Sequence, residues 1–240
     1  MLTILLVSTA DTELLAAAAS GAGYLTANPA RTPAADVAGL AARADLVVLR
    51  LLGGRKAWPE GVAALTAAGR PLVALGGEAA PDAELMALST VPAGVATEAL
   101  GYLREGGPEN LRELARFLSD TVFLTGEGFA PPHPAPPHGL HPLPTTTPAS
   151  PPPTPPSVIV NSFGQIAPHS GHDHENALVV AVVFYRAHEL SGNTAFVDTL
   201  CAALAQRGRS CSGHSIRRRR SATGAWTCGL EFWKASPVRG

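Results

Sequence analysis

The sequence predicts an α/β protein whose N-terminal domain is built on a parallel sheet. Two observations indicate this class. Short, continuous apolar runs recur along the first half of the chain, as in strands that are covered on both faces. Between them lie Ala-rich segments that begin near Thr, Asp or Pro and end near Gly, as helices do. With 46% apolar and 15% charged residues the chain can bury a sizeable core, built mainly from Ala, Leu and Val because aromatic residues are only 5%.

The predicted elements alternate along residues 1–129. Strands are expected at Leu2–Ser8, Ala44–Gly54 and Arg70–Glu78. Helices are expected at Thr9–Ser20, Thr32–Arg43, Trp58–Gly69, Asp82–Ser89, Gly94–Arg104 and Pro108–Ser119. Asp11 or Thr12 is the candidate cap of the first helix, and Pro33 and Pro59 suit the starts of the next two. This order predicts right-handed crossovers and a Rossmann or flavodoxin-like parallel sheet.

Two glycine pairs, Gly53-Gly54 and Gly76-Gly77, fall where predicted strands end. Ligands of open α/β sheets bind at the carboxyl ends of strands, and Arg55 and Lys56 would suit an anion there. The alternative is that glycine only permits a tight turn. The sequence favours the turn, because it contains neither GxGxxG nor GxxxxGK[ST].

Residues 130–177 are predicted to be a Pro/His-rich linker. Of the 22 prolines of the chain, 13 lie within residues 131–156, and proline favours an extended, semi-rigid spacer over helix or central strand. We therefore expect residues 130–170 to lack regular structure; a role as an SH3 or WW ligand is the less favoured alternative. The segment "HSGHDHEN" brings His172 and His174 together as candidate metal ligands, although a polar loop explains it better.

The α/β pattern restarts at residues 178–208, the second predicted domain. "LVVAVVFY" is typical of a buried strand, and Thr194–Arg207 of a helix with Phe196, Leu200, Ala203 and Leu204 on one apolar face. The connection carries the candidate ligand-binding residues Arg186, His188, Glu189 and Asn193. These side chains suit a polar ligand equally as well as the capping of the following helix.

Residues 209–240 form a basic tail that we expect to be disordered. Residues 1–206 hold 18 acidic and 10 basic side chains, whereas residues 207–240 hold seven Arg and one Lys against a single Glu. The four-Arg run 217–220 would repel itself, and no apolar periodicity surrounds it. The three cysteines have no CxxC spacing, and their odd number argues against a disulfide framework. With no leader and no membrane-length apolar run, a cytoplasmic protein is expected.

Three segments resemble the CobN-type large subunit of cobaltochelatase. They are "LVVLRLLGGRKAWPEGVAAL", "LGGEAAPDAELMALSTVPAGVATEALGYLREGGPENLRELARFLSDTVFLTGEGF" and "VVFYRAHELSGNTAFVDTLCAALAQRG". The resemblance covers most of residues 1–130 and 178–208. It implies a ligase that forms nitrogen–metal bonds, by ATP-dependent insertion of cobalt into hydrogenobyrinic acid a,c-diamide in aerobic cobalamin synthesis. It also implies AAA+ ATPase partner subunits that hold the ATP.

The resemblance ends at Gly208, where the family would continue with a strand of the Pro-Leu-Pro-Val-Tyr kind. This chain has "RSCSGHSIRRRR" instead, which suggests a truncated or frameshifted piece that is inactive alone, with no assignable catalytic residue. The alternative function is a small α/β binding module with a basic nucleic-acid-binding arm. That function is disfavoured because the tail lacks interleaved stacking aromatics. A stand-alone flavodoxin-like enzyme is disfavoured because no phosphate loop is present.

Overall fold

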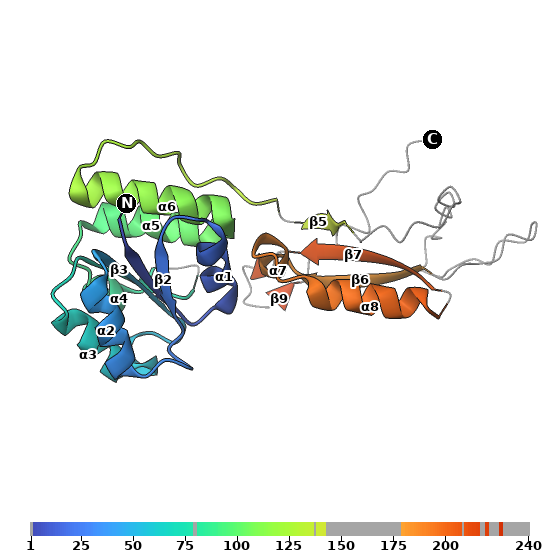
Figure 1. The fold of residues 1–240 in the computed structure, drawn as a ribbon, viewed down its shortest axis with the longest axis horizontal. Coiled ribbons are helices and arrows are strands. Elements are labelled where there is room, and N and C mark those ends of the chain that lie inside the picture. Colours follow the sequence, from blue (N-terminus) through green and yellow to red (C-terminus); the bar gives the residue numbers. More distant parts are fainter. Residues whose placement is uncertain are drawn as a thin grey trace, which may run out of the picture. The chain divides into compact units, whose positions relative to one another are not determined.

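The computed structural model describes residues 2–78, 81–136, 138–142, 179–207, 209–216, 219–220 and 226–227. They divide into two compact units (Figure 1). The N-terminal unit comprises Met1–Pro137 and Ala187–Thr194, and the C-terminal unit comprises His138–Arg186 and Ala195–Gly240. The chain therefore leaves the N-terminal unit, returns to it for eight residues, and leaves it again.

A four-stranded parallel sheet forms the centre of the N-terminal unit, in the order β2-β1-β3-β4. The strands are β1 (Ile4–Ser8), β2 (Tyr24–Ala27), β3 (Leu46–Leu51) and β4 (Leu72–Gly76). The three predicted strands are confirmed, and β3 pairs with both β1 and β4. The edge strand β2 was not predicted, because it has only four residues and exposes Thr26, so its apolar pattern is short.

Helices cover both faces of this sheet (Figure 1). They are α1 (Asp11–Ala19), α2 (Ala34–Arg43), α3 (Pro59–Ala67), α4 (Ala83–Met86), α5 (Ala93–Glu105) and α6 (Gly107–Phe123), with a 3-10 turn at Arg55–Ala57. Alternate residues of β1 face opposite cores: Ile4 and Leu6 pack with α1, α5 and α6, whereas Leu5 and Val7 pack with α2 and α3. This two-sided burial explains why the strands are continuous apolar runs.

The start of α1 differs from the prediction of Asp11 or Thr12 as its cap. The N-cap of α1 is Ala10, which makes no side-chain capping bond. Asp11 instead accepts hydrogen bonds from Asn28 and Arg31, which tie α1 to the loop after β2. Pro33 is the N-cap of α2 and Pro59 is the first residue of α3, as the restricted φ of proline favours.

Residues 125–136, here called the strap, run back along α5 and α6 (Figure 1). As predicted, they contain neither helix nor strand, but they are held by side chains of the two helices. Asn110 accepts from the His133 N–H at 2.8 Å and donates to the His133 carbonyl at 3.0 Å. Tyr102 donates to the Ala130 carbonyl at 2.5 Å. Residues 130–136 thus lack regular structure, as predicted, but they are attached to α5 and α6 by hydrogen bonds.

The C-terminal unit contains a three-stranded sheet in the order β5-β7-β6. Its strands are β5 (His138–His141), β6 (Val179–Tyr185) and β7 (Ser210–Ile216), followed by the short pair β8 (Arg219–Arg220) and β9 (Trp226–Thr227). β6 and β7 are parallel, and β5 is antiparallel to β7. The predictions of an unstructured linker and a disordered tail are therefore wrong for β5, β7, β8 and β9. Main-chain pairing explains β7, because the ladder requires no apolar side chains.

One helix, α8 (Ala195–Ala205), packs against this sheet. The predicted inner face is wrong: Val197 and Cys201 are buried, whereas Phe196 and Leu200 are each 46% exposed. Nearly every residue of α8 is apolar, so the periodicity alone could not distinguish its inner from its outer face. The segment 171–178, which includes His172 and His174, lies outside the described residues.

Candidate functional site

The predicted ligand-binding residues lie in the connection between β6 and α8. The connection contains a short helix, α7 (Arg186–Leu190), where the sequence suggested only a loop. It begins at the carboxyl end of a parallel strand, the edge at which α/β sheets bind ligands. α7 ends at Leu190 and is followed by a turn at Gly192, whose φ of +72° permits the reversal and whose N–H donates to the Glu189 carbonyl at 3.1 Å.

His188 and Asn193 are brought together at the end of this turn. The Asn193 N–H donates to the His188 carbonyl at 2.9 Å, and Asn193 Nδ2 lies 3.4 Å from His188 Nδ1. The hydroxyl of Ser191 donates to the same carbonyl at 3.2 Å. The His188 carbonyl thus accepts two hydrogen bonds and its imidazole lies beside the Asn193 amide, so that two of the four predicted residues are neighbours.

The α5–α6 turn of the N-terminal unit supports this connection. A Cβ placed on Gly107 would lie 3.7 Å from Leu190 of α7, so Leu190 lies beside the α5–α6 turn. Gly106 and Gly107 have φ of +67° and +85°, which lets α6 begin directly after α5. Asn110 donates to the Gly106 carbonyl at 2.8 Å and also holds the strap.

Arg186 contributes to the C-terminal unit instead. Its guanidinium lies over β5: a Cβ on Gly139 would be 3.2 Å from Arg186 Nη1. The Ser215 hydroxyl donates to the Gly139 carbonyl at 3.3 Å, which adds a side-chain bond to the β5–β7 pairing. The glycine at position 139 therefore leaves room for the arginine head group.

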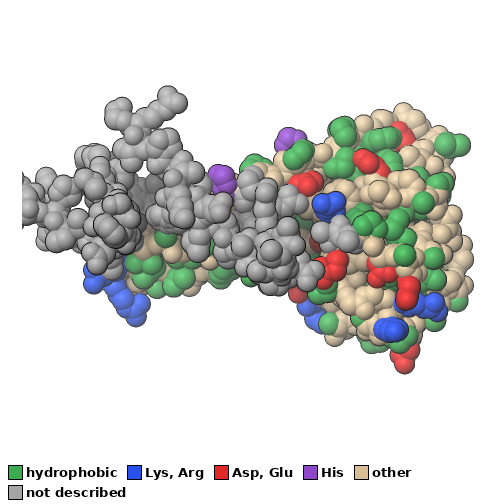
Figure 2. Space-filling model, turned by 180° about the vertical axis from the view of Figure 1, so that it is seen from behind, with side chains coloured by type: hydrophobic (Ala, Val, Ile, Leu, Met, Phe, Trp, Pro, Cys, Tyr) green, Lys and Arg blue, Asp and Glu red, His purple; other side chains and the backbone are tan. Residues whose placement is uncertain are grey.

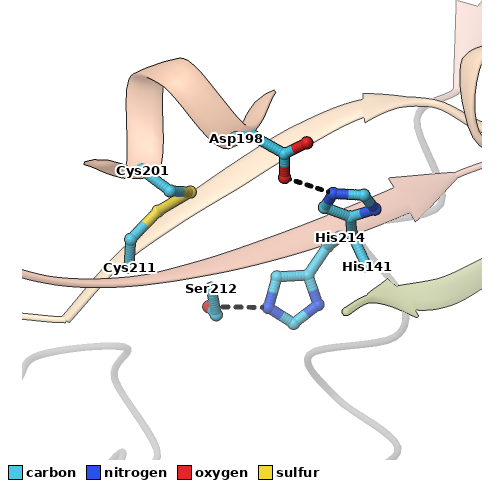
Figure 3. The surroundings of a disulfide bond; sticks show 6 residues. All are labelled: His141, Asp198, Cys201, Cys211, Ser212 and His214. Atoms are coloured by element: carbon cyan, nitrogen blue, oxygen red, sulfur yellow. Dashed lines mark hydrogen bonds and ion pairs between the residues drawn. A yellow bond between two sulfur atoms is a disulfide. The ribbon is translucent and has the colours of Figure 1, made fainter. Parts of the chain in front are cut away.

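A histidine–aspartate pair in the C-terminal unit was missed by sequence analysis. His141 Nε2 lies 2.8 Å from Asp198 Oδ1, and the histidine side chain is only 7% exposed (Figure 3). The ring of Phe184 packs edge-on against the imidazole, with centroids 5.7 Å apart. A carboxylate fixes the tautomer and orientation of a bonded imidazole, so this pair can hold a proton at a defined position. No signal linked the partners, because they are 57 residues apart and His141 lies in the predicted linker.

A disulfide joins Cys201 of α8 to Cys211 of β7, with Cα atoms 5.4 Å apart (Figure 3). This contradicts the expectation from the odd cysteine count, because two cysteines can pair while a third does not. On β7, Ser212 Oγ lies 2.9 Å from His214 Nε2. Within the described residues, no group of three or more His, Cys, Asp or Glu is placed to hold a metal ion.

The strand ends of the N-terminal sheet are closed by close packing. A Cβ on Gly77 would lie 2.8 Å from the Leu52 backbone, and one on Gly76 would lie 2.8 Å from Asp82 Cβ. Gly53 and Gly54 both have positive φ. The glycine pairs therefore serve turns and close approach, the interpretation that the sequence favours.

A buried ion pair occupies the same edge, where the strand order reverses between β1 and β3. Arg50, 7% exposed, pairs with Glu13 and donates to the carbonyls of Leu103, Gly76 and Gly77. The Ser8 hydroxyl donates to Glu13 at 2.7 Å. Burial raises the pKa of Glu13, and the charge of Arg50 acts in the opposite direction. Protein groups thus fill the position where many α/β folds bind ligands.

Comparison with known proteins identifies the class of this α/β chain as that of chelatase subunits. The CobN/Magnesium Chelatase family matches residues 100–223. The chain therefore belongs to the CobN/magnesium chelatase family. The match includes β7, so the prediction that the family pattern ends at Gly208 is wrong.

Two relatives extend the comparison. The aerobic cobaltochelatase subunit CobN of Pseudomonas aeruginosa is 31% identical over 169 residues, which are 69% of this chain and 12% of that protein. The catalytic subunit of cobaltochelatase from Mycobacterium tuberculosis has a TM-score of 0.64 and 39% identity, over 92% of this chain and 16% of that chain. The chain thus spans a small fraction of the length of both relatives. Across the described residues, no helix is long and apolar enough to cross a membrane.

Proposed function

We propose that this chain acts as a segment of a cobaltochelatase large subunit, which inserts cobalt into a tetrapyrrole during aerobic cobalamin biosynthesis. The observation that carries the proposal is the structural match to the cobaltochelatase catalytic subunit over 92% of the chain at 39% identity. Hydrogenobyrinic acid a,c-diamide is the proposed macrocycle, and Co²⁺ is the metal substrate.

The connection between β6 and α8 is the proposed point of contact with the macrocycle. Such a substrate carries carboxylate and amide groups at its edge. Arg186 suits a carboxylate because its guanidinium donates in a planar fork, and Asn193 and His188 suit amides. Glu189 supplies a carboxylate acceptor on the same turn. The hydrogen bonds that fix His188 and Asn193 reduce the entropy lost on binding.

ATP hydrolysis is assigned in this proposal to separate AAA+ ATPase subunits. The sequence contains no GxxxxGK[ST] loop, the usual means by which such enzymes hold phosphates. Insertion also requires the removal of protons from pyrrole nitrogens.

A segment exchange tests the function. Residues 1–216 would replace the corresponding segment of the Mycobacterium tuberculosis catalytic subunit, and cobalt insertion would be followed by the absorbance of the macrocycle with ATP and the partner ATPases. We expect the hybrid to insert cobalt. A folded hybrid without activity, judged against the parent subunit prepared in parallel, would contradict the proposal.

Binding of the macrocycle tests the proposed residues separately. Arg186→Ala and His188→Ala in the hybrid should weaken binding about 10-fold or more, as expected when a charged hydrogen bond worth about 1.5–3 kcal/mol is lost. Arg55→Ala is the matched control, because Arg55 is exposed on the 3-10 turn of the N-terminal unit. Unchanged binding in both site variants, with activity retained, would reject the site and leave the function standing.

A further inference from the structure

Among the residues that the structure describes, the contact between α8 and its sheet contains little apolar material. Its buried core consists of Phe184, Val197 and Cys201, with Val182 and Cys211 partly buried beside it. β7, the central strand, reads "SCSGHSI" and offers few apolar side chains to a helix. A core of this size gives weak stabilisation, and small units generally need a covalent or metal staple.

The Cys201–Cys211 bond supplies such a staple. It links the middle of α8 to the second residue of the central strand, across a sequence separation of 10 residues. Cys201 is only 5% exposed, whereas Cys211 is partly exposed. Cys211 is therefore the more exposed residue of the bonded pair.

We propose that Cys201 and Cys211 form a thiol–disulfide exchange site that determines whether α8 stays fixed on β7. The reductant is a dithiol protein of the thioredoxin class, and the oxidant is a small disulfide such as oxidised glutathione. The proposal concerns the packing of the C-terminal unit and does not depend on the proposed chelatase function.

The exchange balances as follows. A reductant thiolate attacks Sγ of Cys211, the Sγ–Sγ bond breaks, and Cys201 leaves as a thiolate that takes up a proton. The second thiolate of the reductant then attacks its own sulfur in the mixed disulfide and releases Cys211, which is protonated. In sum, two electrons and two protons reach the cysteine pair, and the dithiol becomes a disulfide. Oxidised glutathione reverses the change and leaves as two glutathione thiols.

The histidine–aspartate pair is coupled to this bond through α8 and β7 (Figure 3). Asp198 lies one helical turn before Cys201, and Gly213 lies two residues after Cys211 on β7. Gly213 contacts His141 so closely that a Cβ there would be 2.9 Å from His141 Cβ. When the disulfide opens, α8 loses its covalent anchor and the partners of His141 become less fixed.

Hydrogen exchange of the full chain tests the proposal. One sample is treated with oxidised glutathione and the other with dithiothreitol, and alkylation with mass spectrometry counts the free thiols. In the oxidised sample we expect Cys201 and Cys211 to resist alkylation, and amides of α8 and β7 to be at least several-fold better protected. Amides of β1 and β3 should exchange equally in both samples. Equal protection of β7 in both samples, or alkylation of both cysteines after oxidation, would overturn the proposal.

Two variants separate exchange from packing. Cys201→Ala/Cys211→Val removes the thiols and keeps an apolar contact, so its protection should not respond to dithiothreitol. Cys228→Ser removes the third cysteine and should leave the response of the wild type unchanged. If the double variant proves too unstable to measure, the comparison of the two wild-type samples still decides the outcome. A dithiothreitol response in a folded double variant would contradict the assignment.

Discussion

At the scale of single residues, the Arg50–Glu13 pair places two charges in the interior of the N-terminal unit. Both side chains lie at the end of a largely apolar sheet. Arg50 donates to Glu13 of α1, to Leu103 of α5, and to the carbonyls of Gly76 and Gly77 at the end of β4. Such a pair adds little net stability over an apolar replacement, because both ions must be desolvated. Removal of one partner alone lowers the stability, since the charge of the other partner then stays buried without its counter-ion.

Substitution of one partner should therefore destabilise the N-terminal unit strongly. We expect Arg50→Met to lower the free energy of unfolding by about 3–5 kcal/mol, because Glu13 remains buried without its cation. The double variant Glu13→Gln/Arg50→Met should recover most of that loss in urea unfolding. Arg31→Met, which breaks an exposed pair with Asp11, should cost at most about 1 kcal/mol. Equal effects of Arg50→Met and Arg31→Met would show that burial of the pair is unimportant.

In the C-terminal unit, Gly213 is a single residue on which the local packing depends. Its Cα faces His141 and Val197, and an added Cβ would meet them at 2.9 Å and 3.3 Å. We expect Gly213→Ala to displace His141, with a cost of about 1–3 kcal/mol from overpacking and faster hydrogen exchange in β5. Gly94→Ala serves as control, because a Cβ at Gly94 in α5 would meet nothing within 4 Å. Unchanged exchange in β5 would mean that β5 does not depend on this close approach.

At the scale of elements, the sequence predicted the strands and helices that are marked by repeated apolar patterns. β1, β3, β4 and the long helices of the N-terminal unit follow from continuous apolar runs and helix-like periods. β7 could not be predicted because its pairing depends on the backbone and its side chains are polar or small. The strap could not be predicted either, since Asn110, Glu113 and Asp120 read as surface residues of α6 until their backbone partners are known.

The same limit applies to the candidate site. The connection at Arg186, His188 and Asn193 is predicted as a candidate site because its polar residues follow an apolar strand. The His141–Asp198 pair and the disulfide depend on the alignment of β5 and β7, which brings together distant parts of the chain. Sequence spacing carries no information on such contacts.

Attachment of the strap can be tested at Asn110, which is buried and makes three hydrogen bonds. Asn110→Ala leaves the Gly106 carbonyl and both main-chain groups of His133 without these partners, at a cost of about 1–3 kcal/mol. We expect chymotrypsin to cleave after Phe129 faster in this variant than in the wild type. Glu109→Gln, at an exposed position of the same turn, should leave the cleavage rate unchanged. Equal rates in all three chains would contradict a docked strap.

The start of the strap should detach at acidic pH. The hydrogen bond from Thr125, and then those from the backbone at Glu127, Gly128 and Gly126, lower the pKa of Asp120. A carboxyl group whose pKa is lower in the folded state stabilises that state above its unfolded pKa of 3.8, and the contribution is lost as pH falls through the folded pKa. Amide exchange at Glu127 and Gly128, corrected for intrinsic rates, should therefore rise below about pH 4. Asp120→Asn should abolish this pH dependence; a wild type that shows none would contradict the assignment.

At the scale of the whole molecule, the two units differ in the size of the apolar core that stabilises each of them. The N-terminal unit has a sheet covered on both faces by helices, with an apolar core on each side. In the described part of the C-terminal unit, a small core lies on the α8 side of the sheet, together with the disulfide. Residues 187–194, which connect β6 to α8, belong to the N-terminal unit. The chain segments of the C-terminal unit are thus separated in sequence by residues 187–194.

Separate expression of the two parts tests this asymmetry. A chain of residues 1–136 should unfold cooperatively in urea with a slope of about 1–3 kcal/mol per molar, because both cores and the strap are retained. A chain of residues 138–240 should show little protection from hydrogen exchange, since residues 187–194 lose their contact with Gly107 and the remaining core is small. Oxidation of Cys201 and Cys211 should raise that protection only partly, because the disulfide restrains α8 and β7 but cannot replace the lost docking surface. Full protection in the isolated C-terminal chain would mean that it folds independently and that residues 187–194 stabilise it without their partner.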